Sequence, residues 1–119
     1  MKSRLTVGVD FGGTNVKVGL VGPNGRMSHS AVLASRAISR PGPFVEAVSR
    51  AVESLAASAG LRVAMLRGIG VGAPGPVDAA RGVVHSMVNV PGWRDVPLVR
   101  LLARRLHLRC HVDNDVNVF

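Results

Sequence analysis

Apolar residues alternate with small or polar ones in two runs near the start of the chain, over residues 5–9 and residues 16–20. A period of two is typical of strands, so the pattern predicts a strand, a turn over residues 10–15 and a returning strand. A second turn signal, Gly-Pro-Asn-Gly at residues 22–25, precedes a third strand at about residues 27–34. Three strands joined by short turns make an antiparallel meander.

A helical spacing follows the meander. After Arg-Pro-Gly-Pro at residues 40–43, apolar residues recur three or four positions apart from residue 44 to residue 59, and Gly60 is placed to end the helix. A second helix is expected to be capped by Asp95, with Pro97 in its first turn. Its leucines, at positions 98, 101, 102 and 106, form the buried side, and its arginines, at positions 100, 104 and 105, are expected to face solvent.

Two further segments have the apolar character of strands, residues 67–73 and about residues 109–112. Each lies after a helix, which predicts parallel strands beside the first one. Gly70 and Gly72 weaken a strand, so something is expected to pack or bind close to that backbone. Residues 89–95 are expected to be irregular. The predicted fold class is α/β, with a mixed sheet in the order β-β-β-α-β-α-β.

Polar motifs follow three of these strands. D-F-G-G-T-N occupies residues 10–15, A-P-G-P residues 73–76 and D-N-D-V-N residues 113–117. Ligands bind at the carboxyl ends of parallel strands in open α/β sheets. We therefore expect the three motifs to meet at one edge of the sheet and to form a binding site there.

The first of these motifs predicts a phosphate-and-metal turn. Gly12 and Gly13 supply the positive φ of a tight hairpin and leave backbone N–H groups open to an anion. Thr14 adds a hydroxyl donor, and Asp10 would need a cation, Mg²⁺, between its carboxylate and a phosphate. The phosphate loops that open a helix are excluded, because these glycines lead back into a strand. An ordinary hairpin turn with a surface aspartate fits the same residues, so the downstream motifs decide.

Composition and charge limit the classes of partner. The 119 residues make one domain at most, and the core must be aliphatic, because 47% of residues are apolar and 3% aromatic. The formal charge is +8, but the arginines are scattered without interleaved aromatic residues, which argues against nucleic acid as a partner. A basic surface suits phosphorylated ligands equally well.

The remaining chemistry-bearing side chains have ordinary interpretations. The single cysteine, Cys110, is expected to be a buried, inert thiol, which fits a reducing cytosol. Neither a membrane span nor a signal peptide is expected. The expected location is therefore cytoplasmic. The four histidines are expected to be surface or satisfied residues, because a helix-to-strand break separates His107 from His111. Trp93 is expected to be a packing anchor.

With these motifs assembled, the chain resembles the ROK family of sugar kinases and related repressors, within the ribonuclease H-like (actin-like ATPase) fold. The matching stretches are G-V-D-F-G-G-T-N at residues 8–15, G-V-G-A-P-G-P-V-D at 70–78, N-V-P-G-W at 89–93 and V-D-N-D-V-N at 112–117. Their order and spacing resemble the glucokinase branch most. The resemblance implies a cytoplasmic transferase of carbohydrate metabolism and glycolysis.

The resemblance implies a role for each matching residue. Asp115 would be the catalytic base that takes the proton of the sugar 6-hydroxyl. Asn89 and Asn114 would hydrogen-bond the sugar, and the loop Ala73, Pro74 and Gly75 would lie against its ring. ATP phosphates would be held at Gly12, Gly13, Thr14 and Asn15, with Mg²⁺ at Asp10.

Two positions qualify this assignment. Many relatives carry Lys where this chain has Asn15, and Lys17, on the same strand face, could replace it or be a solvated side chain. Asp113 is interpreted as a structural or capping residue in preference to a second base.

The resemblance also implies that residues 1–119 are the N-terminal lobe of a two-lobed protein, homodimeric at full length. Its His/Cys zinc site would belong to the C-terminal lobe. The alternatives are a sugar-sensing transcriptional regulator of the same family, disfavoured because Asp10 leaves no room for a preceding helix-turn-helix, and a fragment inactive alone. The hexose, and ATP versus polyphosphate as donor, stay open.

Overall fold

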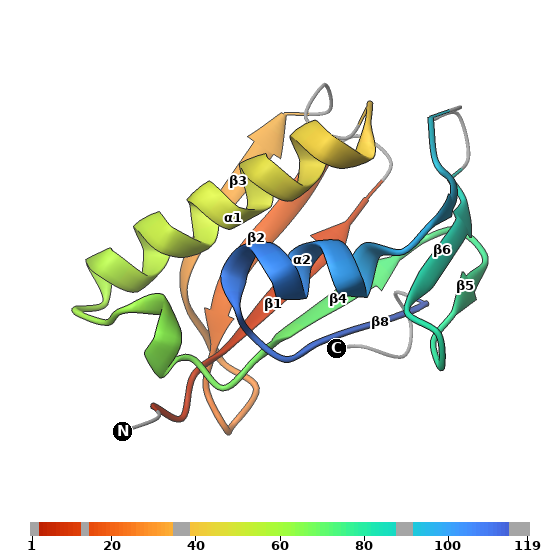
Figure 1. Cartoon of the computed structure of the whole chain (residues 1–119). Helices are drawn as coiled ribbons and strands as arrows, with labels where there is room; N and C mark the ends of the chain where they lie inside the picture. Colours follow the sequence, from red (N-terminus) through yellow and green to blue (C-terminus); the bar gives the residue numbers. More distant parts are fainter. Residues whose placement is uncertain (1–2, 13–14, 35–38, 88–91, 115–119) are drawn as a thin grey trace.

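The computed structural model describes residues 3–12, 15–34, 39–87 and 92–114. A five-stranded sheet and two helices form its main body (Figure 1). Their bounds are β1 Thr6–Phe11, β2 Asn15–Val21, β3 Met27–Ala34, α1 Pro41–Ser58, β4 Ile69–Ala73, α2 Leu98–Leu106 and β8 Cys110–Asn114. A short 3-10 turn, Val63–Met65, follows α1.

The strand order is β3-β2-β1-β4-β8. β1, β2 and β3 pair antiparallel, whereas β1, β4 and β8 pair parallel. The predicted meander and the two predicted parallel strands are therefore confirmed, and β4 lies directly beside β1 as expected. The main body keeps the predicted order of strands and helices.

The two faces of this sheet differ. Val9, Val71 and Val112 are in register across β1, β4 and β8, and all three are buried on the face that α1 and α2 cover (Figure 1). The next residue of each strand, in the row Asp10, Gly72 and Asp113, lies on the opposite face. The helices of the described residues leave that second face open (Figure 1).

A second, smaller sheet occupies the section between β4 and α2. It consists of β5 Val77–Asp78, β6 Val83–Ser86 and β7 Arg94–Val96, all antiparallel, in the order β5-β6-β7. The expectation of irregular structure over residues 89–95 is wrong for residues 94 and 95, which belong to β7. Strands of two to four residues are too short to show a period of two.

The start of α2 also differs from the prediction. Pro97 is the N-cap residue, and Asp95 does not cap the helix. The Asp95 carboxylate instead pairs with Nδ1 of His85 at 2.8 Å, from a backbone with φ of 49°. The Val99 N–H in the first turn donates to the Gly82 carbonyl at 3.2 Å, so the β5–β6 turn supplies the cap.

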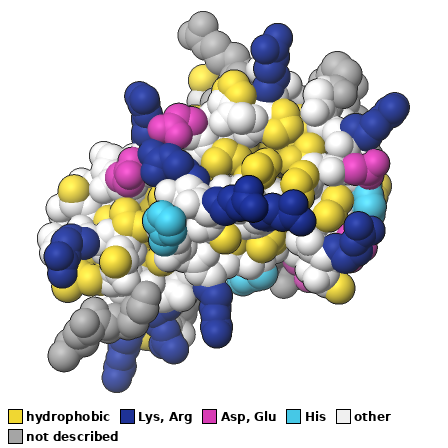
Figure 2. All heavy atoms as spheres, in the orientation of Figure 1, with side chains coloured by type: hydrophobic (Ala, Val, Ile, Leu, Met, Phe, Trp, Pro, Cys, Tyr) yellow, Lys and Arg dark blue, Asp and Glu magenta, His cyan; other side chains and the backbone are white. Residues whose placement is uncertain are grey.

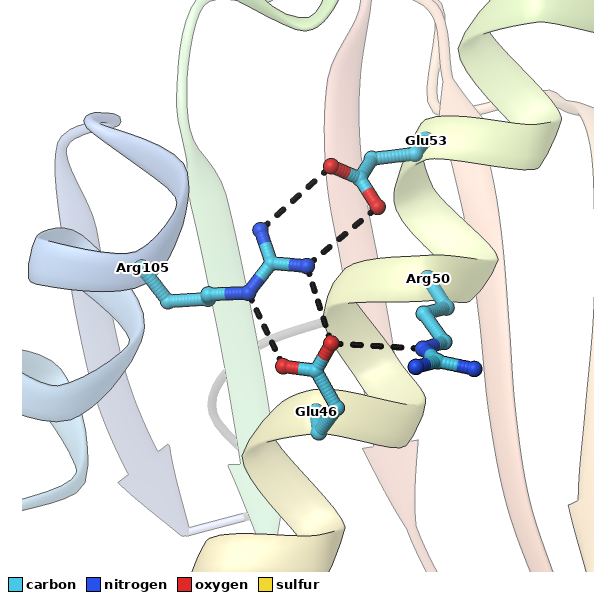
Figure 3. Close-up of polar contacts among 4 residues, drawn as sticks. All are labelled: Glu46, Arg50, Glu53 and Arg105. Atoms are coloured by element: carbon cyan, nitrogen blue, oxygen red, sulfur yellow. Dashed lines mark hydrogen bonds and ion pairs between the residues drawn. The ribbon is translucent and has the colours of Figure 1, made fainter.

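Arg105 is a second correction, because it turns toward α1 and does not face solvent freely. Its guanidinium donates to both oxygens of Glu46, at 2.9 and 3.0 Å, and to Glu53 at 3.3 Å (Figure 3). The hydrogen bond from Arg105, followed by that from Arg50, lowers the pKa of Glu46 to about 2. These ion pairs tie α2 to α1 across the outer surface of the helical layer.

No helix within the described ranges has both the length and the apolar character needed to cross a membrane.

Candidate functional site

The carboxyl ends of β1, β4 and β8 lie next to one another. Asp10 is in register with Gly72, and Gly72 with Asp113. Register partners in a sheet project on the same side, so the two carboxylate residues stand on the open face with only a glycine between them. The predicted meeting of the three polar motifs is confirmed for the described part of each motif.

At the end of β1 the chain turns back into β2, as predicted. The Gly12 N–H donates to the Asn15 carbonyl at 3.0 Å. Gly12 does not have a positive φ; a Cβ there would lie 3.1 Å from the Asn15 carbonyl oxygen, so the close approach of the backbone is what favours glycine here. Because the Gly12 N–H already donates to Asn15, it is not a free donor for a phosphate. The missing side chain of Gly12 still leaves room for a phosphate to approach. Gly13 and Thr14 lie outside the described residues.

Three aromatic rings support this turn from the covered face. Phe11 stacks on Phe44 at 4.5 Å, and Trp93 meets both rings edge-on at 5.0 and 5.2 Å. Trp93 is 2% exposed, so the prediction of a packing anchor is confirmed. Phe11, Phe44 and Trp93, named here the aromatic cluster, hold the end of β1 and hence the position of Gly12.

Two opposite charges lie on the open face beside the turn. Asp10 and Lys17 are exposed and directly opposite each other in the β1–β2 register, and Asn15 is exposed two residues before Lys17. An exposed carboxylate near a glycine turn is a ligand that would suit Mg²⁺. Among the described residues, no three His, Cys, Asp or Glu side chains gather as they would around a protein-bound metal ion.

The A-P-G-P loop leaves β4 and rests on the small sheet. Ala73 is buried, Pro74 is exposed, and a Cβ on Gly75 would collide with the Ser86 carbonyl oxygen. The Pro76 carbonyl accepts a hydrogen bond from the His85 N–H at 2.9 Å. β6 therefore fixes the shape of this loop from behind.

The end of β8 brings Asp113 and Asn114 to the same edge, because Ala73 is in register with Asn114. Both side chains are half-buried. Asp113 Oδ1 accepts the backbone N–H of Asn114 at 2.7 Å, which agrees with a structural role for Asp113. Asn89 and Asp115 lie outside the described residues, so their predicted roles stay predictions.

The other predicted residues of β4 and β8 are placed clearly. A Cβ on Gly70 would lie 2.8 Å from the His111 ring, so the expected close neighbour of that glycine is this histidine. Cys110 is half-buried, and burial raises the pKa of its thiol to about 12, as expected for an inert cysteine. His107 ends α2 with φ of 55°, so the break between His107 and His111 is confirmed.

No pattern in the sequence indicated the His85–Asp95 pair. The two residues are ten positions apart, on β6 and β7, and only the pairing of these short strands brings them together. A period-of-two signal from longer strands could have shown that juxtaposition.

Comparison with known proteins identifies what this arrangement resembles. The sequence profile of the ROK family matches residues 6–119. Glucokinase from Thermotoga maritima is 30% identical over 113 residues, covering 95% of this chain and 34% of that protein. The crystal structure of a ROK family glucokinase from Streptomyces griseus, in complex with glucose and AMPPNP, superposes with a TM-score of 0.80 and 34% identity over 95% of this chain and 34% of that one.

A regulator shares the fold as well. A ROK family transcriptional regulator, a homolog of the E. coli MLC protein, has a TM-score of 0.75 at 17% identity, covering 93% of this chain and 28% of that one. The chain spans about a third of the length of the curated glucokinases it matches. The solved sugar kinases it superposes on have the actin-like ATPase fold, which is the fold of this chain.

Proposed function

This chain belongs to the ROK family, and we propose that it is the N-terminal lobe of an ATP-dependent hexose kinase of the glucokinase type. The observation that carries the proposal is the row Asp10, Gly72 and Asp113 at the carboxyl ends of the parallel strands, next to a glycine hairpin that returns as a strand. The relatives named glucokinase support the same activity.

In this proposal ATP and the sugar bind at different halves of the edge formed by the ends of β1, β4 and β8. The hairpin at residues 12–15 receives the ATP phosphates, and Asp10 would hold a Mg²⁺ ion, which would supply neutralisation of the phosphate charge. The lysine that many relatives carry at position 15 is replaced by Asn15, and the exposed Lys17 opposite Asp10 supplies a cation on the same face.

The sugar lies at the other half, between Ala73–Pro74–Gly75 and the end of β8, with Asn89 and Asn114 as hydrogen-bonding residues. Asp115 follows Asn114 and accepts the proton of the 6-hydroxyl as the new O–P bond forms. Phosphoryl transfer needs mainly positioning and charge neutralisation, so one carboxylate base at this edge is sufficient chemistry. A second lobe would enclose both substrates and exclude water.

The test is a coupled kinase assay of the full-length protein over a panel of hexoses, with ATP and polyphosphate as donors. Asp115→Asn is expected to lower kcat about a hundredfold or more, since it removes the general base. Asp113→Asn, two residues away, is the matched control and should cause a much smaller loss. Near-normal turnover in Asp115→Asn, or equal losses in both variants, would contradict the assignment.

The second candidate is a sugar-sensing regulator, which the shared fold of the ROK transcriptional regulator favours. A regulator would bind a hexose without phosphorylating it. Calorimetry that detects hexose binding, together with an assay that detects no phosphoryl transfer from either donor, would favour this candidate over the kinase.

A further inference from the structure

A hollow of about 550 Å³ lies on the outer side of the small sheet, away from the residues assigned above. Its charged side chains come from the β5–β6 turn, from β6 and β7, and from the first turn of α2. The residues that line it are Arg81, Val83, His85, Asp95, Pro97 and Arg100. Figure 2 shows basic side chains above and below a histidine and an acidic side chain at the β6 end of the molecule.

Backbone hydrogen bonds fix the two segments that carry the arginines of this hollow. Arg81 belongs to a turn whose shape is fixed by the Arg81 N–H, which donates to Asp78 Oδ1 at 3.1 Å. The same turn is tied to α2 by the hydrogen bond from the Val99 N–H to the Gly82 carbonyl. Arg81 and Arg100 therefore face one hollow from two elements that are joined by their main chains.

The His85 imidazole, the third polar group of the hollow, is also held in one orientation. Asp95 has φ of 49°, an uncommon conformation for a residue with a side chain, and it places its carboxylate 2.8 Å from Nδ1 of His85. With Nδ1 held by Asp95, the other ring nitrogen, Nε2, is the one left for a ligand. The His85 side chain is 43% exposed, so a small molecule can reach it.

Charge in the hollow favours an anion. Two arginines line the hollow but only one carboxylate, Asp95, which is already paired with His85. The first turn of α2 contains no acidic residue and carries Arg100, although the partial positive charge of a helix N-terminus favours acidic side chains there. The charge of +8 on the chain adds to the positive potential.

We propose that this hollow binds a phosphate group, held by the forked guanidinium donors of Arg81 and Arg100 and by the Nε2–H of His85 as an imidazolium, whose Nδ1–H pairs with Asp95. Guanidinium groups match phosphate oxygens in bidentate pairs, which is why arginine suits this role. The site is separate from the proposed catalytic edge and does not rest on the kinase assignment. β6 lies between the two, since the His85 N–H bonds to the Pro76 carbonyl of the A-P-G-P loop.

The experiment follows the imidazole resonances of the full-length protein by ¹H–¹³C NMR, with the His85 signal identified by its loss in His85→Gln. Three probes distinguish the sources of the phosphate group: inorganic phosphate, glucose 6-phosphate and AMP. We expect a saturable shift of the His85 signal with one or more of them. The probe with the highest affinity then identifies the source.

Two variants test the assignment of the donors. Arg81→Gln with Arg100→Gln is expected to weaken binding at His85 by about tenfold or more. Arg104→Gln, an exposed arginine on the same helix outside the hollow, should leave it unchanged. A His85 signal that moves with none of the probes, or that moves equally in the double variant, would overturn the proposal.

Discussion

The two faces of the main sheet follow different rules, although every strand contributes residues to both. On the face under α1 and α2, the row Val9, Val71 and Val112 is almost wholly buried. One residue further along, the row Asp10, Gly72 and Asp113 consists of carboxylates and a glycine. Burial of apolar surface stabilises the first face, whereas the second leaves space and charge for ligands. Because side chains alternate along a strand, each strand places residues that stabilise the fold on one face and residues available to ligands on the other.

The aromatic cluster offers the strongest test of this division. Phe11→Ala should lower the free energy of unfolding by about 3–5 kcal/mol, because it removes a fully buried ring and leaves a cavity between Phe44 and Trp93. Urea unfolding followed by circular dichroism measures the change.

Val32→Ala is the control on the other face. Val32 is 64% exposed and in register with Lys17, so the expected change is within about 0.5 kcal/mol. Equal losses in the two variants would show that the open face contributes as much to stability as the covered one.

The reactivity of a thiol at position 110 or at position 111 of β8 compares the two faces directly. Cys110 is in register with the buried Ile69, and burial raises the pKa of its thiol to about 12. His111, the next residue, is exposed on the other face. In a Cys110→Ala background, His111→Cys should react with iodoacetamide at pH 8 roughly a thousandfold faster than Cys110 does in the native chain, because its thiolate fraction is larger.

Mass spectrometry of the alkylated protein over time measures both rates. Unfolding in urea should remove the difference, because both thiols then meet the same solvent. Comparable rates in the folded protein would mean that the two faces do not differ in access or polarity at β8.

The smallest expected effect concerns the outer surface of the helical layer. The folded-state pKa of Glu46, about 2, lies below its value of 4.5 in the unfolded chain. Its ion pairs with Arg105 and Arg50 therefore stabilise the fold fully above about pH 4.5 and are lost as the pH falls toward 2. Arg105→Gln should lower Tm slightly at pH 6, and the difference from the native chain should narrow between pH 4.5 and pH 2.

Arg104→Gln, on the same helix, is the matched control and should not show this pH dependence. Thermal melts across the pH series measure both variants. A difference between Arg105→Gln and the native chain that stays constant down to pH 2 would contradict the role given to Glu46.

Local signals in the sequence predicted the main body of the fold. β1 and β2 each show a period of two, and a turn signal precedes β3. α1 ends at Ser58, and Gly60, with φ of 73°, follows its C-cap. The buried strands β4 and β8 come after helices. The small sheet could not be predicted, because its strands are short and its pairing depends on contacts between distant residues. Asp95 was misassigned for the same reason: its partner, His85, lies on another short strand.

The sequence predicted those parts of the candidate site that lie at the carboxyl ends of strands. Register alone brings Asp10, Gly72, Ala73 and Asn114 to one edge. The sequence does not show which polar groups are already hydrogen-bonded within the fold. The Gly12 N–H donates to the Asn15 carbonyl, and the Arg105 guanidinium binds two glutamates. The role of Asp115 stays a prediction.

The aromatic cluster also gives the protein an internal optical reporter. Trp93 is the single tryptophan of a chain without tyrosine, and it packs against the residue that immediately precedes the glycine hairpin. Within residues 1–119, fluorescence excited at long wavelength therefore comes from one indole, at the base of the turn proposed to receive ATP phosphates. Any nucleotide that displaces this turn would change the emission spectrum without an added label.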